Sequence, residues 1–78
     1  MEYDKFYEWL VSDKKMNHRS AKDVVSRCKR VCNISGVSSI DDKTEIQLIN
    51  ASGYDETSMF VKSQLKRSIV LYNEFLRG

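Results

Sequence analysis

The chain has 78 residues, of which 41% are hydrophobic and 31% are charged, and its formal net charge is +2. A chain of this length forms one domain with a small core, and its apolar content excludes a disordered protein. Its longest apolar stretches, such as residues 69–71, exclude a membrane-spanning helix. With two cysteines and no apolar segment after Met1, we expect a cytoplasmic protein without disulfides.

Charge alternates along the chain in four segments, so the small net charge conceals strongly charged regions. Residues 14–30 carry seven cations against one acid, and residues 62–77 carry four cations against one acid. Residues 1–13 and 41–56 are acidic. If the two basic segments meet in the fold, they form a basic surface that suits an acidic partner.

Two helices are predicted in the first half of the chain. The first covers residues 3–12, and its Trp9 is the expected anchor of the core. The second covers residues 17–32, begins at Asn17, which is a favoured N-cap, and ends before Gly36. Its apolar stripe, at spacings of three and four, consists of Ala21, Val24, Val25, Cys28, Val31 and Cys32.

Two more helices are predicted in the second half. The third covers residues 41–51 and is expected to stop at Gly53. The fourth runs from Thr57 or Ser58 to Arg77. Because no segment reads as a strand, we predict an all-α fold, a compact four-helix bundle in a single domain. The inward positions are Ile46, Leu48 and Ile49 in the third helix and Val61, Leu65, Ser68, Ile69, Tyr72, Phe75 and Leu76 in the fourth.

Few residues could support catalysis or bind a metal. His18 is the one histidine, and there is no glycine-rich phosphate loop or paired-carboxylate motif. Cys28 and Cys32 lie one helical turn apart, but a metal would need two further ligands, and His18 lies about 15 Å from Cys28 along the helix. We therefore expect a protein that is not an enzyme and has no metal or cofactor, with both cysteines packed in the core.

Basic residues gather on the sides of the second and fourth predicted helices that lie opposite the apolar stripes. Long cations and small hydroxyls on one exposed face suit the phosphates and base edges of duplex DNA, so we predict a DNA-binding module. We expect the two helices to lie side by side and to form one positive surface. The predicted DNA-binding residues are Lys14, Lys15, Arg19, Lys22, Ser26, Lys29, Lys62, Ser63, Lys66 and Arg67.

Two other interpretations stay open at this point. The cations can form an ordinary solvated face, as they do on most charged helices. Alternatively, the chain can be a protein-interaction module whose acidic and basic helices pair with a second copy or with another protein.

The order of residue types also resembles a known family. The chain has an aromatic first helix with Phe6 and Trp9-Leu10, then the opening Met16-Asn17-x-Arg19-Ser20, and a closing segment. That closing segment reads Ser58-x-x-x-Lys62-x-x-Leu65-Lys66-Arg67-x-x-x-x-Tyr72-x-x-Phe75-Leu76. This pattern resembles the N-terminal core-binding domain of the tyrosine recombinases, the phage-integrase family, although Val24 and Val31 stand where the family has aromatic residues.

The resemblance carries several expectations about function. It implies a SAM-like domain of four helices that holds one side of duplex DNA through its second and fourth helices. In that family the catalytic residues and the tyrosine nucleophile belong to a separate C-terminal domain, so Tyr72 is not expected to be that nucleophile. The chain would then be a non-catalytic fragment of a longer recombinase, or a small stand-alone relative, that works in DNA integration and recombination.

Overall fold

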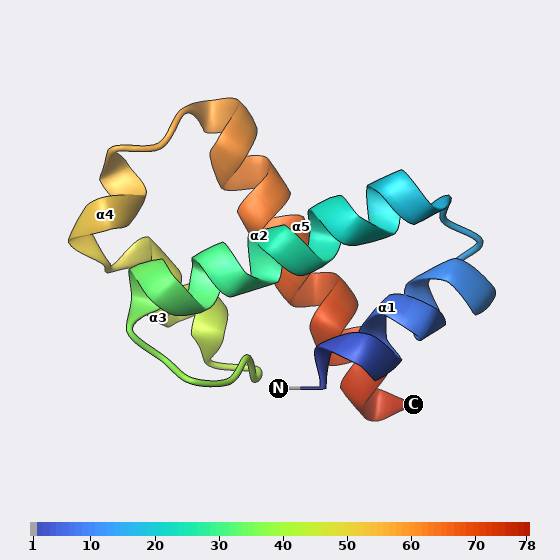
Figure 1. The fold of residues 1–78 in the computed structure, drawn as a ribbon. Helices are drawn as coiled ribbons and strands as arrows, with labels where there is room; N and C mark the ends of the chain where they lie inside the picture. Colours follow the sequence, from blue (N-terminus) through green and yellow to red (C-terminus); the bar gives the residue numbers. More distant parts are fainter. Residues whose placement is uncertain (1) are drawn as a thin grey trace.

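A computed structural model describes residues 2–78, which form helices joined by short connections and contain no strand. The helices are α1 (Tyr3–Ser12), α2 (His18–Ser35), α3 (Thr44–Ile49), α4 (Ser52–Asp55) and α5 (Met59–Arg77), as Figure 1 shows. The prediction of a compact all-α protein is confirmed, and the molecule measures 35 × 22 × 15 Å. No helix in the described range combines the length and the apolar character needed to cross a bilayer.

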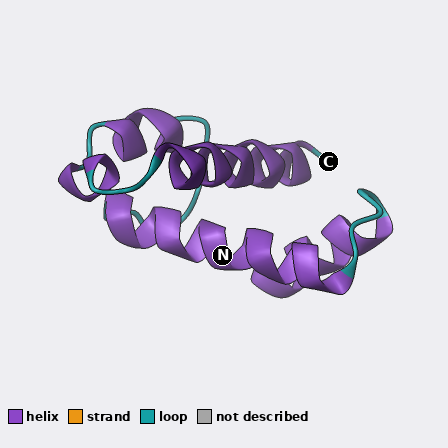
Figure 2. Ribbon diagram, turned by 90° about the horizontal axis from the view of Figure 1, so that it is seen from above, coloured by secondary structure: helices purple, strands orange, loops and turns teal. Residues whose placement is uncertain are grey.

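The helices form two layers. Seen from above, α2 and α1 lie in one layer and α5 in the other, with α3 and α4 at one end of the molecule (Figure 2). The chain packs most extensively where α2 meets α5, and next where α1 meets α2. The two longest helices therefore bury their apolar stripes against each other.

The limits of α2 follow from its capping residues. The side chain of Asn17 accepts a hydrogen bond from the backbone N–H of Ser20 at 2.8 Å, as expected for an N-cap. The helix continues to Ser35, beyond the predicted end at Cys32, because Gly36 closes it in a left-handed conformation with φ of 72°. The start of α5 is confirmed as well, since the hydroxyl of Ser58 accepts from the N–H of Val61 at 3.2 Å.

The core is centred on Phe6 and not on Trp9. Phe6 is fully buried and meets Tyr72 edge-to-face with ring centroids 4.9 Å apart, whereas Trp9 is only half-buried beside Phe75. Phe6 takes this place because it lies where α1 packs against α5. The other buried apolar residues are Leu10, Ala21, Val24, Cys28, Val31, Ile40, Leu48, Tyr54, Leu65, Ile69 and Leu71.

The third predicted helix is replaced by two short ones, so the described residues contain five helices where four were expected. Asp41 folds back on Thr44, whose hydroxyl accepts from the Asp41 N–H at 2.8 Å, and α3 starts only at Thr44. Ala51 is extended, with ψ of 137°, and separates α3 from α4. Gly53 therefore lies inside α4 and does not end a helix.

This rearrangement changes which side chains are buried. Ile46 and Ile49, both predicted to face inward, are 65% and 44% exposed, and only Leu48 of the three is buried. The break at Ala51 instead brings Tyr54 into the core. Counting the apolar residues of the segment could not reveal which of them are buried, because a six-residue helix can turn only one or two positions toward the core.

Candidate nucleic-acid interface

The outer side of α2 is strongly basic. Residues two positions apart in a helix point about 200° apart, so Arg19 lies opposite the buried Ala21. By the same reasoning Ser26 lies opposite the buried Cys28. The only acid within α2 is Asp23. We define the α2 face by its exposed residues Arg19, Lys22, Ser26, Lys29 and Arg30.

The cations of the α2 face are available to an external anion. Within residues 2–78 the ion pairs are Lys5 with Glu2 and Lys14 with Glu74, and none involves the α2 face. Lys29 has an aromatic neighbour, because its ammonium lies 5.2 Å from the centre of the Tyr3 ring. A cation over a neutral ring keeps its full charge, so it can still meet a phosphate.

Two of the predicted residues on α5, Ser63 and Arg67, point away from the α2 face, whereas Lys62 and Lys66 lie at the side of the buried stripe. Ser63 is exposed and lies two positions from the buried Leu65, so it points away from α2. Arg67 is also exposed and also lies two positions from Leu65. Because α2 and α5 pack against each other through their buried stripes, Ser26 and Ser63, which lie opposite these stripes, point to opposite sides of the molecule. The expected continuous positive surface is therefore divided into two, and we call Lys62, Ser63, Lys66 and Arg67 the α5 face.

Two lysines of the α5 face are less accessible than their counterparts on α2. Lys62 is half-buried, and its ammonium lies 5.1 Å from the centre of the Tyr54 ring. Lys66 is half-buried too. The same helix also exposes apolar side chains at its start, where Met59 is 83% and Phe60 is 71% exposed.

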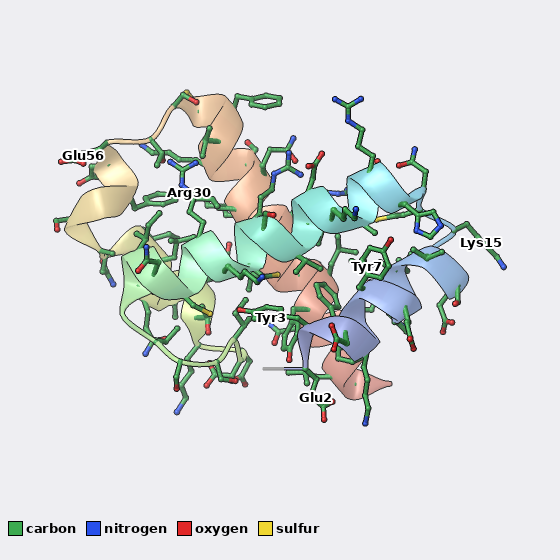
Figure 3. All side chains as sticks on the ribbon, in the orientation of Figure 1. Glu2, Tyr3, Tyr7, Lys15, Arg30 and Glu56 are labelled. Atoms are coloured by element: carbon green, nitrogen blue, oxygen red, sulfur yellow. The ribbon has the colours of Figure 1, made fainter. Side chains whose placement is uncertain are left out.

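The connection between α1 and α2 holds the remaining two predicted residues, Lys14 and Lys15. The ammonium of Lys14 lies 2.8 Å from a carboxylate oxygen of Glu74 and 5.7 Å from the Trp9 ring, so among residues 2–78 it is the predicted cation that forms an ion pair. Lys15 is exposed and takes a left-handed backbone conformation, with φ of 57°. Figure 3 shows its side chain projecting from the end of the molecule.

A groove runs along the boundary between α1 and α2, beside the α2 face. It has a volume of about 410 Å³, and its lining includes Lys22, Ser26 and Lys29 from the α2 face. Tyr3 and Tyr7 of α1 line its other side, where α1 faces α2 (Figure 3). These tyrosines are not among the residues predicted from the sequence, although their spacing of four residues places them on one side of a helix.

The hydroxyls of both tyrosines have neighbours on α2. The Tyr7 hydroxyl is hydrogen-bonded to Nδ1 of His18, and the two rings lie 5.9 Å apart. Burial, together with the neighbouring thiols of Cys32 and Cys28, raises the pKa of Tyr3 to about 12. Tyr3 is therefore a neutral hydrogen-bonding group at physiological pH.

The cysteines belong to the packing of the molecule. Cys28 is fully buried, and its thiol donates to the backbone carbonyl of Ser68 at 3.6 Å. Burial raises the pKa of Cys28 to about 12, although a separate hydrogen bond with the side chain of Ser68 opposes this shift, so the thiol is protonated at neutral pH and a poor nucleophile. Cys32 is half-buried, and neither cysteine forms a disulfide within residues 2–78. Among residues 2–78, no three His, Cys, Asp or Glu side chains are grouped closely enough to hold a metal ion.

The comparisons of this chain with protein-family models, curated proteins and solved structures gave no match. The chemistry open to the α2 face is the binding of anions by several ammonium and guanidinium groups with one hydroxyl among them. An extended row of this kind matches a polyanion better than a small anion, because its charges are spread over more than three helical turns.

Proposed function

We propose that this chain is a DNA-binding module that contacts duplex DNA mainly through the α2 face and Lys15. The observation that carries the proposal is the row of four exposed cations on one helix face, none of them in an ion pair among residues 2–78. Each cation neutralises a backbone phosphate and releases a counterion, and Ser26 donates a hydrogen bond to a phosphate oxygen. The start of α2 adds positive potential, because its N–H groups point toward the same end as Lys15.

The resemblance to the core-binding domain of tyrosine recombinases supports the same proposal. In the SAM-like arrangement of that domain, α1, α2, α3 and α5 correspond to the four family helices, and α4 is an addition between the last two. The chain then acts by holding DNA and not by catalysis. Its proposed partners are duplex DNA and a C-terminal catalytic domain in the parent recombinase, in the cytoplasm.

The α5 face has a smaller part in this proposal. Its exposed residues Ser63 and Arg67 point away from the α2 face, so one straight duplex segment cannot contact them and the α2 face together. We assign its four residues to a secondary contact with phosphates, made where DNA bends around the domain or where a second segment approaches. Lys14 has a secondary part as well, because Glu74 already neutralises it.

The test is the salt-dependent binding of a labelled 16-base-pair duplex, followed by fluorescence anisotropy at 50 and 200 mM salt. The wild-type chain should bind in the range of about 10⁻⁴ to 10⁻⁶ M, with an affinity that falls as salt rises. The double variant Lys22→Glu/Lys29→Glu should weaken binding by more than about tenfold and reduce the salt slope by about 2.

The matched control is the double variant Lys66→Glu/Arg67→Glu, which changes charge equally on the α5 face. It should weaken binding by only about twofold to threefold, because a secondary contact contributes well under 1.4 kcal/mol. Binding that does not change with salt, or equal losses for the two double variants, would contradict the proposal.

A second candidate function is a protein-interaction module, and one observation favours it. Met59 and Phe60 are more than two-thirds exposed at the start of α5, and Ile46 of α3 is 65% exposed. Exposed apolar residues beside the acidic positions Asp55 and Glu56 suit a basic protein partner. Sedimentation velocity separates the two functions, because a strict monomer that binds duplex DNA argues against pairing with a second copy.

A further inference from the structure

The groove between α1 and α2 is lined by two kinds of side chain. Contact with the phosphates of a duplex does not require both kinds. One wall belongs to the α2 face and presents Lys22, Ser26 and Lys29. The other wall belongs to α1 and presents the half-buried rings of Tyr3 and Tyr7. Phosphates need only the first wall, whereas aromatic rings offer binding surface to the flat faces of unpaired bases.

The cationic wall has the form of a short track. Lys22, Ser26 and Lys29 follow one another at successive turns of α2, and Lys22 and Lys29 are separated by about 10 Å along the helix axis. A chain of phosphates running along α2 can therefore meet both ammonium groups and the hydroxyl between them. Asp4 lies on the α1 side of the groove, so a phosphate is repelled there and favoured on the α2 side.

The aromatic wall is held in place by contacts with α2. Tyr7 is fixed by its hydrogen bond to His18, and Tyr3 has the Lys29 ammonium 5.2 Å from its ring centre. A base can stack on that face of Tyr3 once the flexible Lys29 side chain turns from the ring toward the phosphate of the same nucleotide. The groove has a volume of about 410 Å³ and is open to solvent, so a base can reach the tyrosine rings from outside.

We propose that this groove binds a segment of single-stranded nucleic acid, with its phosphates on Lys22 and Lys29 and an unpaired base against Tyr3 and Tyr7. The inference rests on the proposed function, which it deepens by naming a second form of nucleic acid that the α2 side binds with the help of the tyrosines. A duplex keeps its bases stacked on each other, so it uses the cations of the α2 face without the tyrosines.

The first experiment uses the intact wild-type chain and three labelled ligands at 50 mM salt. They are a 12-residue oligothymidylate, a 12-residue abasic phosphodiester of equal charge, and a 12-base-pair duplex. We expect oligothymidylate to bind about tenfold more tightly than the abasic strand, because stacking on an aromatic side chain contributes a factor of this size. Equal affinity for the two strands would overturn the inference. Because this experiment uses only the wild-type chain, a variant that fails to fold cannot affect its outcome.

The second experiment removes the ring from one wall. Tyr7→Leu should weaken oligothymidylate binding by about fivefold to tenfold and change duplex binding by less than twofold. Tyr7→Phe is the matched control, since it retains the ring and loses only the hydrogen bond to His18. Its loss of oligothymidylate affinity should be clearly smaller than that of Tyr7→Leu, at about twofold to threefold, because the stacking surface remains. A loss in Tyr7→Leu that is equal for the strand and the duplex would overturn the inference.

The two proposals fail in distinguishable ways. If the duplex binds with the expected salt dependence but the strands bind equally with and without bases, the single-strand inference is wrong and the DNA-binding proposal stands. If neither the duplex nor oligothymidylate binds at 50 mM salt, both proposals are wrong.

Discussion

The two long helices, α2 and α5, share a design but differ in their surroundings. Each starts at a side-chain cap, Asn17 or Ser58, and each carries lysine, arginine and serine opposite a buried stripe. On α2 the lysines border a groove shared with the tyrosines of α1. On α5 two lysines are half-buried, one of them beside Tyr54, and apolar side chains are exposed at the start of the helix.

This difference shows that a helical pattern of cations does not decide how the cations are used. The pattern determines which side of the helix they occupy, because residues two positions apart point in nearly opposite directions. Their accessibility depends on the helices that pack alongside. The α2 face is a candidate interface because its cations are exposed and unpaired among residues 2–78, whereas the α5 face offers fewer accessible charges.

The largest expected effect is on the free energy of unfolding, and it tests the buried contact between α2 and α5. Leu65 is fully buried on the stripe of α5, so Leu65→Ala should lower the free energy of unfolding by about 3 kcal/mol, through lost apolar burial and a cavity. Urea denaturation followed by circular dichroism measures this loss. The matched control is Val70→Ala on the outer side of the same helix, where the side chain is 57% exposed and the expected change is below about 0.5 kcal/mol.

An intermediate effect tests the burial of the Cys28 thiol between the two helices. The pKa of the Cys28 thiol is raised from 9.0 to about 12, so above pH 9 the unfolded chain releases a proton that the folded chain retains. Stability is therefore unaffected by this group below pH 9 and falls as pH rises from 9 toward 12, by about 1 kcal/mol per pH unit. Tyr3, with its pKa raised from 10.0 to about 12, adds to the loss above pH 10.

Cys28→Ala separates the two contributions. Urea denaturation at half-unit steps from pH 8 to 10 should show a declining stability in the wild type and a nearly flat one in this variant. An equally steep decline in both proteins would mean that the Cys28 thiol ionises in the folded state as readily as in the unfolded chain.

The smallest expected effect tests the ion pair between Lys14, on the α1–α2 connection, and Glu74 of α5. Lys14 and Glu74 are 33% and 41% exposed, so Glu74→Gln should change the free energy of unfolding by less than about 0.5 kcal/mol. Freeing Lys14 should tighten duplex binding by up to about twofold, which the anisotropy assay measures, and the gain should vanish in Lys14→Gln/Glu74→Gln. A stability loss above 1 kcal/mol would show that the ion pair has a structural role instead.

The sequence was sufficient to predict the helices whose signals are local and repeated. The stripe of α2 and the caps at Asn17 and Ser58 lie in the chain itself, and helical geometry converts them into a buried side and a starting point. The all-α class followed for the same reason. The prediction of the third helix was wrong. Its few apolar residues fit one helix as well as two, and only packing selected Leu48 and Tyr54 for the core.

The candidate site also has one part that the sequence predicts and another that only the fold decides. Sequence alone determined which residues of α2 are cationic and which side of the helix they share, because both are properties of one continuous segment. Only the tertiary structure decided that the α2 and α5 faces point apart, that Glu74 neutralises Lys14, and that Tyr3 and Tyr7 border the cations of α2. Each of these depends on how separate helices cross and pack, which is set by the fit of buried side chains far apart in the sequence.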